Sequence, residues 1–259
     1  MIGTVLYVLS ILLKLGIIPA AVLIYKKKIT FLQGLFVGTF MFLASFGCQV
    51  YSANLTYGYS LIDSVVNEIF DTMLASYSVT AGLAAEEAAL MQSIITSVRD
   101  MYFALFPCIM VCTNLMWAYF LLMLSKGLLA LFKRDVSGFV RFCDFRMSRA
   151  GIFMGIVAYI LSSFMDGSRV SLAFENLCAI IIFATFVCGF SLVDFKLRSR
   201  VRLSVVRFLI YVVLGTFLMM GIGPVVLVII GVIDAFGDLR KPKKKFNDDN
   251  NDNNDNIDE

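Results

Sequence analysis

The sequence predicts an all-α fold, a polytopic transmembrane helix bundle of about seven spans. Of 259 residues, 59% are hydrophobic and 16% are charged, and the mean hydropathy is +0.85. Soluble domains carry about a quarter charged residues. Apolar runs of roughly 18 or more residues recur, which is long enough for a helix to cross a bilayer. These runs are continuous and do not alternate, so they favour helices over the strands of a membrane barrel.

Five spans can be placed from the apolar runs alone. They are expected at Ile2–Tyr25, Ile29–Tyr51, Met101–Leu124, Ile152–Met165 (extended backwards by a turn) and Leu172–Val193. The first run lacks the preceding basic residue and the small-residue cleavage site of a signal peptide. We therefore expect it to remain as the first span.

Between the second and third spans, Ser52 to Asp100 forms the one long loop, and two apolar stripes at helical spacing run through it. The stripe from Leu61 to Tyr77 forms one face of a helix whose other face is polar and acidic. A second stripe ends at Val98 and runs straight into the third span. We expect two amphipathic surface helices that lie on the membrane or cap the bundle.

The closing stretch, Leu203 to Phe236, is too long for one span. Its 34 residues would make a helix of about 51 Å, against a hydrocarbon core of roughly 30 Å. Gly221, Gly223 and Pro224 supply backbone freedom and a missing donor where a turn is needed. Two short spans, near Leu203–Met219 and Ile222–Phe236, fit better.

The basic residues set the predicted orientation. With seven spans, 19 of the 22 lysines and arginines fall on one side. They are Lys26–Lys28, Lys126, Lys133, Arg134, Arg141, Arg146, Arg149, Lys196, Arg198, Arg200, Arg202, Arg207, Arg240, Lys241 and Lys243–Lys245. By the positive-inside tendency this side is cytoplasmic. The N-terminus is then outside and the C-terminus inside.

The chain is expected to form one integral membrane domain, residues 1–245, followed by a cytoplasmic tail. Residues 246–259 are rich in Asn and Asp and bury no apolar surface, so the tail should be disordered. The expected partners are the lipid bilayer, a small-molecule ligand and a protein bound at the cytoplasmic loops. No nucleic-acid partner is expected.

The composition argues against an enzyme. The chain has no histidine, the commonest general base and metal ligand. A Ser or Cys nucleophile would therefore lack its usual base. The six cysteines form no CxxC pair, and Cys108 and Cys112, one turn apart, are better explained as small buried hydrophobes than as metal ligands. We expect neither a catalytic site, a cofactor nor a metal.

Four polar residues in or beside the spans are candidate substrate-binding residues. Lys14 lies mid-span, where a lysine costs about 2.5–3.5 kcal/mol, so it should face the interior, a cavity or an acid; alternatively the helix begins after it. Asn114 lies midway along the third span and more often bonds a neighbouring helix. Glu175 and Asn176 open the fifth span, where the alternative role is helix-start chemistry. Glu175 is the natural partner for Lys14 if the helices pack that way.

Further residues indicate how the helices pack and end. Asp194, Asp234 and Asp238 fall at cytoplasmic span ends, where ion pairs with Arg198 and Arg240 are expected. The pairs Gly34/Gly38 and Gly151/Gly155 have the GxxxG spacing that lets helices approach closely.

Several short motifs carry a resemblance to a known family. They are Asp144-Phe145-Arg146-Met147-Ser148, Asn176 at the start of a span, Cys188 to Phe195, and the ending Gly231 to Arg240. Together they resemble the YybS-like family of bacterial membrane proteins, a group of unknown function. Members usually read Trp-Arg-Leu-Pro where this chain has Phe145-Arg146-Met147-Ser148, and usually begin with one more span.

The resemblance implies a location and two alternative functions. The location is the bacterial inner membrane. The family is distantly similar in fold to the S components of energy-coupling-factor vitamin transporters, which implies binding or uptake of a small solute. It is also similar to the cell-shape membrane protein MreD, which implies a scaffold that docks partners through its basic cytoplasmic loops. No binding residues carry over from either relative.

Overall fold

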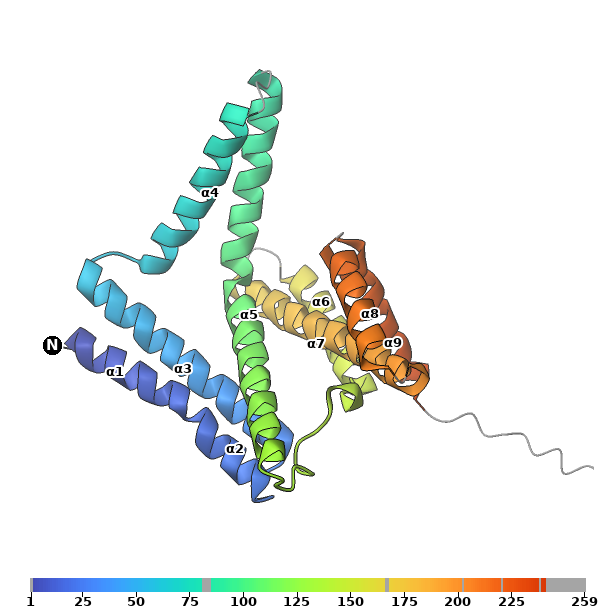
Figure 1. The fold of residues 1–259 in the computed structure, drawn as a ribbon. Helices are drawn as coiled ribbons and strands as arrows, with labels where there is room; N and C mark the ends of the chain where they lie inside the picture. Colours follow the sequence, from blue (N-terminus) through green and yellow to red (C-terminus); the bar gives the residue numbers. More distant parts are fainter. Residues whose placement is uncertain are drawn as a thin grey trace, which may run out of the picture.

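The structure, a computed structural model, describes residues 2–80, 85–165, 168–201, 203–219, 221–237 and 239–240. All the regular elements in these ranges are helices, which confirms the all-α prediction (Figure 1). Residues 246–259, the expected disordered tail, lie outside the described residues.

The first span is two helices that pack against a third. α1 (Ile2–Leu15) and α2 (Ile17–Tyr25) are separated by Gly16, whose missing Cβ leaves room for the Sδ of Met41 on α3 (Phe31–Tyr57). The Oγ of Ser45 donates to the Ser10 carbonyl at 2.8 Å, which joins α3 to α1. Such serine bonds satisfy polar groups inside an apolar bundle.

The two amphipathic stripes form a projecting hairpin. α4 is Leu61–Thr80, and α5 runs without interruption from Ala85 to Leu131, 47 residues or about 70 Å. The prediction that the second stripe continues into the third span is confirmed. However, the pair stands away from the bundle and does not lie across it (Figure 1). Because α5 is one continuous helix, its first turns extend the axis of the span, and α4 packs back along them.

An aromatic and aliphatic core closes the end of the bundle opposite the hairpin. Ile24 of α2, Phe31 of α3 and Leu122 of α5 are almost completely buried together, with Phe139 of the following loop. Gly34 makes the approach possible, because a Cβ there would meet the Cδ1 of Ile24 at 2.5 Å. The predicted role of the Gly34/Gly38 pair in close packing is therefore confirmed.

The second half of the chain is built around α7. The elements are a 3₁₀ turn η1 (Phe142–Asp144), α6 (Arg149–Phe164), α7 (Arg169–Arg200), α8 (Ser204–Met219) and α9 (Ile222–Gly237). α7 packs against α5, α6, α9 and η1. Its closest approach is to α9, where Gly189 and Gly231 bring the two backbones into contact.

The closing stretch is broken where the sequence predicts. The chain bends by 112° between α8 and α9. Gly221 takes φ +77°, a left-handed conformation that favours glycine, and Pro224 lies in the first turn of α9, where a missing N–H costs little. One straight closing helix is therefore excluded.

In the part of the chain that the structure describes, four helical segments are long and apolar enough to cross a membrane: Ile2–Tyr25, Phe31–Tyr57, Glu87–Leu131 and Arg169–Arg200. α6, α8 and α9 have 16 residues each, about 24 Å of helix. That is shorter than a hydrocarbon core of roughly 30 Å. By length and composition the structure supports four spans, or five if α8 and α9 count as one. The count of seven stays a prediction.

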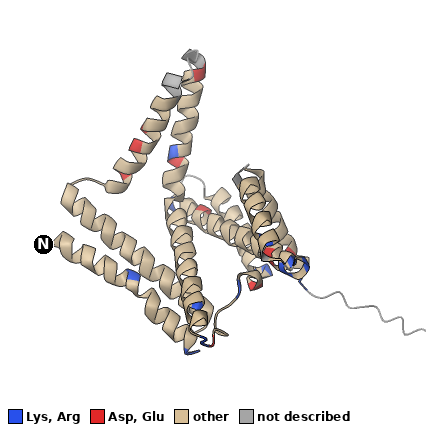
Figure 2. Cartoon of the chain, in the orientation of Figure 1, with Lys and Arg blue, Asp and Glu red and all other residues tan. Residues whose placement is uncertain are grey.

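The two ends of the molecule differ in the sign of the charged residues that they carry. Figure 2 shows lysines and arginines gathered at the end where α2 meets α3 and where α7 and α9 finish, whereas the projecting hairpin carries mostly acidic residues. We call these the basic end and the hairpin end. Of the basic residues in the orientation argument, Arg202, Lys241 and Lys243–Lys245 lie outside the described residues.

Candidate functional site

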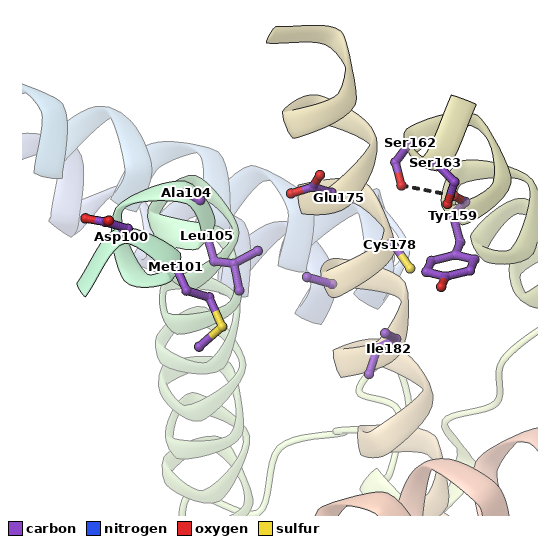
Figure 3. Close-up of a pocket in the computed structure, with 11 residues that line it drawn as sticks. Asp100, Met101, Ala104, Leu105, Tyr159, Ser162, Ser163, Glu175, Cys178 and Ile182 are labelled. Atoms are coloured by element: carbon purple, nitrogen blue, oxygen red, sulfur yellow. Dashed lines mark hydrogen bonds between the residues drawn. The ribbon is translucent and has the colours of Figure 1, made fainter. Parts of the chain in front are cut away.

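A groove of about 780 Å³ lies at the hairpin end between α5, α6 and α7 (Figure 3). One face of each helix lines it, because the residues recur at helical spacings of three and four. They are Asp100, Met101, Ala104 and Leu105 from α5; Tyr159, Ser162 and Ser163 from α6; and Glu175, Cys178, Ala179 and Ile182 from α7. α7 is the floor, and α5 and α6 are the walls.

The lining changes from polar to apolar with depth. α5 and α7 run from the hairpin end toward the basic end, so Asp100 and Glu175 lie near the mouth, and Leu105 and Ile182 lie deeper. α6 runs the other way, which places Ser162 and Ser163 toward the mouth. The polar groups of α6 and α7 therefore lie at the same level, near the mouth.

Short-range bonds position Glu175. Ser168 caps α7 by accepting from the Ser171 N–H at 3.0 Å. The Ser171 hydroxyl is 3.1 Å from the Oε1 of Glu175 and also 3.1 Å from the Ser162 carbonyl of α6. This hydroxyl thus joins the mouth of the groove to the end of α6 and orients the carboxylate. Figure 3 shows Glu175 directed toward α5.

Asn176, next along the chain, points into α5. Pro107 lacks an N–H and breaks the hydrogen-bond ladder of that helix. Around this break the Asn176 Oδ1 accepts from the Cys108 N–H at 3.0 Å, and its Nδ2 donates to the Ala104 carbonyl at 2.9 Å. One carboxamide engages the two groups that would bond each other in an unbroken helix. Asn176 therefore holds α5 against α7 beside the groove.

The other two candidates lie elsewhere. Lys14 is exposed and does not face the interior as expected, because the buried position on that part of α1 is Ser10. α1 packs against α2 and α3, with α5 between it and α7, so Lys14 and Glu175 are not brought together (Figure 1). Asn114 donates to the Met110 carbonyl of its own helix at 2.8 Å and not to a neighbouring helix. Of the four predicted site residues, Glu175 alone lines the groove.

A buried ionic cluster, which we call the Arg240 centre, organises the basic end. The Arg240 and Asp234 side chains are only 5% and 3% exposed, and the Arg240 Nε donates to Asp234 Oδ2 at 2.9 Å. The guanidinium also donates to the carbonyls of Phe145, at 2.8 Å, and Cys143. Ser191 of α7 donates to the Phe142 carbonyl at 2.7 Å. The centre therefore fastens the α5–α6 loop to α7 and α9.

A second ion pair stands beside it on α7. The Asp194 side chain is 3% exposed, accepts from Arg198 Nε at 2.9 Å and accepts from the Tyr211 hydroxyl of α8. The predicted pairs of Asp194 with Arg198 and of Asp234 with Arg240 are confirmed. Asp238 lies outside the described residues.

The loop between α5 and α6 is held at its surface by further pairs. Lys27 and Asp135 are 3.0 Å apart. The Ser137 N–H and the Lys27 ammonium lower the pKa of Asp135 to about 2. The Arg141 guanidinium lowers the pKa of Asp144, whereas burial raises the pKa of the Cys143 thiol.

Sequence reasoning missed most of the groove. In the sequence, Tyr159, Ser162, Ser163 and Cys178 lie within apolar runs and Asp100 ends a loop, so none of them is a predicted site residue. The available signal was the i, i+3, i+4 spacing of three hydroxyl residues at the end of α6. Within the described ranges, no three Cys, Asp or Glu side chains are grouped so that they could hold a metal ion.

Comparison with known proteins gives one match. A family model described as "Predicted membrane protein (DUF2232)" matches residues 1–235. No curated protein and no solved structure matches the chain.

Proposed function

The chain belongs to this family of predicted membrane proteins, DUF2232, and from that premise we propose that it binds a small solute in the groove between α5, α6 and α7. The observation that carries the proposal is the convergence of polar groups from α6 and α7 on one open groove walled by α5, with Glu175 at its mouth. Binding sites of this kind are concave and mostly apolar, with few polar groups that fix orientation.

The S-component-like fold that the family resemblance implies agrees with the same proposal. Those proteins bind their substrates within a membrane helix bundle, and uptake would follow if this chain works with a transport partner. We propose the corresponding topology: seven spans in the bacterial inner membrane, with the hairpin outside and the Arg240 centre in the cytoplasm. The groove then opens to the outside.

Native mass spectrometry of the detergent-purified full chain tests the proposal. We expect a retained small molecule in the wild type and its loss in Ala179→Phe, which fills the floor of the groove. Ala130→Phe, at the basic end of α5, is the matched control and should keep the ligand. A wild type that never carries or binds a solute, in any preparation, contradicts the proposal.

A second candidate function is a membrane scaffold that docks a protein at the basic end. The favouring observation is that the Arg240 centre fixes the backbone of the α5–α6 loop while Arg141 stays 68% exposed. A preformed basic surface loses little entropy on binding an acidic partner.

Co-purification tests the scaffold. A partner that binds there should be lost when Lys133, Arg134 and Arg141 are changed to Glu together. Changing the same three residues to Gln removes their positive charges without adding negative ones. Comparison of the two variants then separates the loss of attraction to the partner from new repulsion. A complex that survives the Glu changes counts against docking at this loop.

A further inference from the structure

We infer that the groove takes an amphipathic organic cation, with its ammonium group held at Glu175 and its apolar body lying along α7. This inference rests on the proposed function and adds the chemical class of the ligand. Three features carry it: the charge of the lining, the order of polar and apolar groups with depth, and the openness of the lower groove.

The charge of the lining is negative. Asp100 and Glu175 contribute carboxylates, and none of the lining residues within the described ranges is Lys or Arg. Beside the groove, the Arg99 Nε is 3.8 Å from Asp100 Oδ1, which is a long ion pair. Figure 3 shows the Asp100 carboxylate turned away from the groove, so Glu175 is the acid in position to meet a bound cation. An anionic ligand would meet uncompensated repulsion here.

The order of polar and apolar lining residues, from the mouth inward, fixes the orientation of the ligand. Along α7, Glu175 and Ile182 are seven residues apart, about 10 Å of helix. Between them lie Cys178 and Ala179, and Leu105 faces the same level from α5. A ligand with one charged end and an apolar body of about 10 Å satisfies both parts of the groove. A ligand that is polar throughout would leave its lower groups without partners.

The lower groove is open at its side. Tyr159 and Ile182 are 64% and 50% exposed. In a bilayer these side chains face acyl chains, so the body of an amphiphile can enter laterally while its head group stays at the mouth. At the mouth, the Ser162 and Ser163 hydroxyls both donate to the Tyr159 carbonyl, and their oxygens remain as acceptors for an ammonium head group.

The test uses three probes with one body and three charges: phenylbutylamine, phenylbutanol and phenylbutyrate. Each is titrated into the full chain in nanodiscs of zwitterionic phosphatidylcholine, with empty nanodiscs subtracted to remove lipid partitioning. We expect the amine to bind about tenfold or more tightly than the alcohol, since a charge-assisted hydrogen bond to a carboxylate is roughly twice as strong as a neutral one. The butyrate should bind weakest.

Two variants locate the effect. Glu175→Gln should remove the preference for the amine over the alcohol and leave the affinity for the alcohol unchanged. Glu68→Gln, which removes one acid from the exposed face of α4, is the matched control and should keep the preference. Ala179→Phe should weaken the binding of all three probes, because it fills the floor.

The outcomes separate this inference from the proposed function. If the alcohol or the butyrate binds as tightly as the amine, or if Glu175→Gln leaves the preference intact, the cation assignment is overturned while solute binding stands. If no probe binds and no solute is retained in native mass spectrometry, the proposed function fails and the inference fails with it.

Discussion

The buried Arg240 side chain contacts three parts of the basic end: the α5–α6 loop, α7 and α9. Its guanidinium satisfies carbonyls of the α5–α6 loop and pairs with Asp234, and its Cζ lies 5.8 Å from the centre of the Phe195 ring. Arginine suits such a position because its donors are spread over a planar fork. Removing one member of a buried ion pair leaves the other charge desolvated.

Arg240→Met is therefore expected to destabilise the protein by about 3–5 kcal/mol, the usual cost of breaking a buried pair. Chemical unfolding in detergent micelles measures it. Arg134→Met, at an exposed position, should change stability little. The double variant Arg240→Met with Asp234→Leu should recover much of the loss, because no charge is then buried alone. A double variant as unstable as the sum of the two single variants would contradict this account.

Gly189 is a second residue whose identity is fixed by packing. A Cβ there would overlap the Leu227 carbonyl of α9, so Gly189→Ala must separate α7 from α9. We expect a loss of about 3 kcal/mol, at the upper end for overpacking. Gly215→Ala on α8 meets no atom within 4 Å and should be neutral or slightly stabilising. Equal thermal stability of the two variants would show that the helix contact is looser than described.

At the scale of elements, α5 depends on α7 for its continuity. Pro107 removes a donor within the helix, and the Asn176 carboxamide bonds the groups on both sides of the break. The dependence is local, since it involves one carbonyl, one N–H and one side chain. It also lies one residue from Glu175, so the groove and the weak point of α5 share a turn of α7.

Replacing Asn176 by Leu should destabilise the protein by roughly 1–3 kcal/mol, since the Cys108 N–H and the Ala104 carbonyl lose their partner. Pro107→Ala in the Asn176→Leu background should recover part of this loss, because an uninterrupted helix satisfies its own groups. Pro107→Ala alone should be close to neutral, with Asn176 still bonded. Failure of the second change to rescue the first would contradict the pairing of these two residues.

The α5–α6 loop should respond to acid. Asp135 has its pKa lowered from 3.8 to about 2 in the folded protein. A carboxylate whose pKa is lowered on folding stabilises the folded state at pH values above its unfolded pKa. That contribution is lost as the pH falls from about 4 toward 2. A nitroxide on a cysteine at Arg134 should therefore become more mobile over that window. In an Asp135→Asn background the label should be mobile throughout, and a pH-independent label in the wild type would argue against the Lys27 contact.

The elements were largely predictable, and the groove was not. Apolar runs and the Gly221–Pro224 break place the helices because they are local signals. Helix ends were missed by several residues, since α7 extends through Arg200 on polar residues that no apolar pattern marks. The groove depends on which faces of α5, α6 and α7 meet, and that packing has no local signature. Glu175 was found because a carboxylate near a span is unusual, whereas serines and a tyrosine are common there.

At the scale of the whole molecule, the proposed orientation can be read from both ends. In a cysteine-free background, a cysteine replacing Asp71 on α4 should react with an impermeant maleimide added to intact cells. A cysteine replacing Lys244 should react only after the membrane is permeabilised. Reaction at Lys244 from outside would overturn the closing hairpin, and protection at Asp71 would overturn the outward hairpin.

Because α5 is continuous, its N-terminal part moves as one rigid segment that pivots at Pro107, beside the groove. From Ala85 to Phe106 this segment is 22 residues, about 33 Å, so a tilt of about 10° at Pro107 displaces its tip by about 6 Å. A change in the spacing of α5 and α7 too small to measure in the groove is thereby magnified several-fold at the far end. The position of that tip would therefore respond to small changes in the groove.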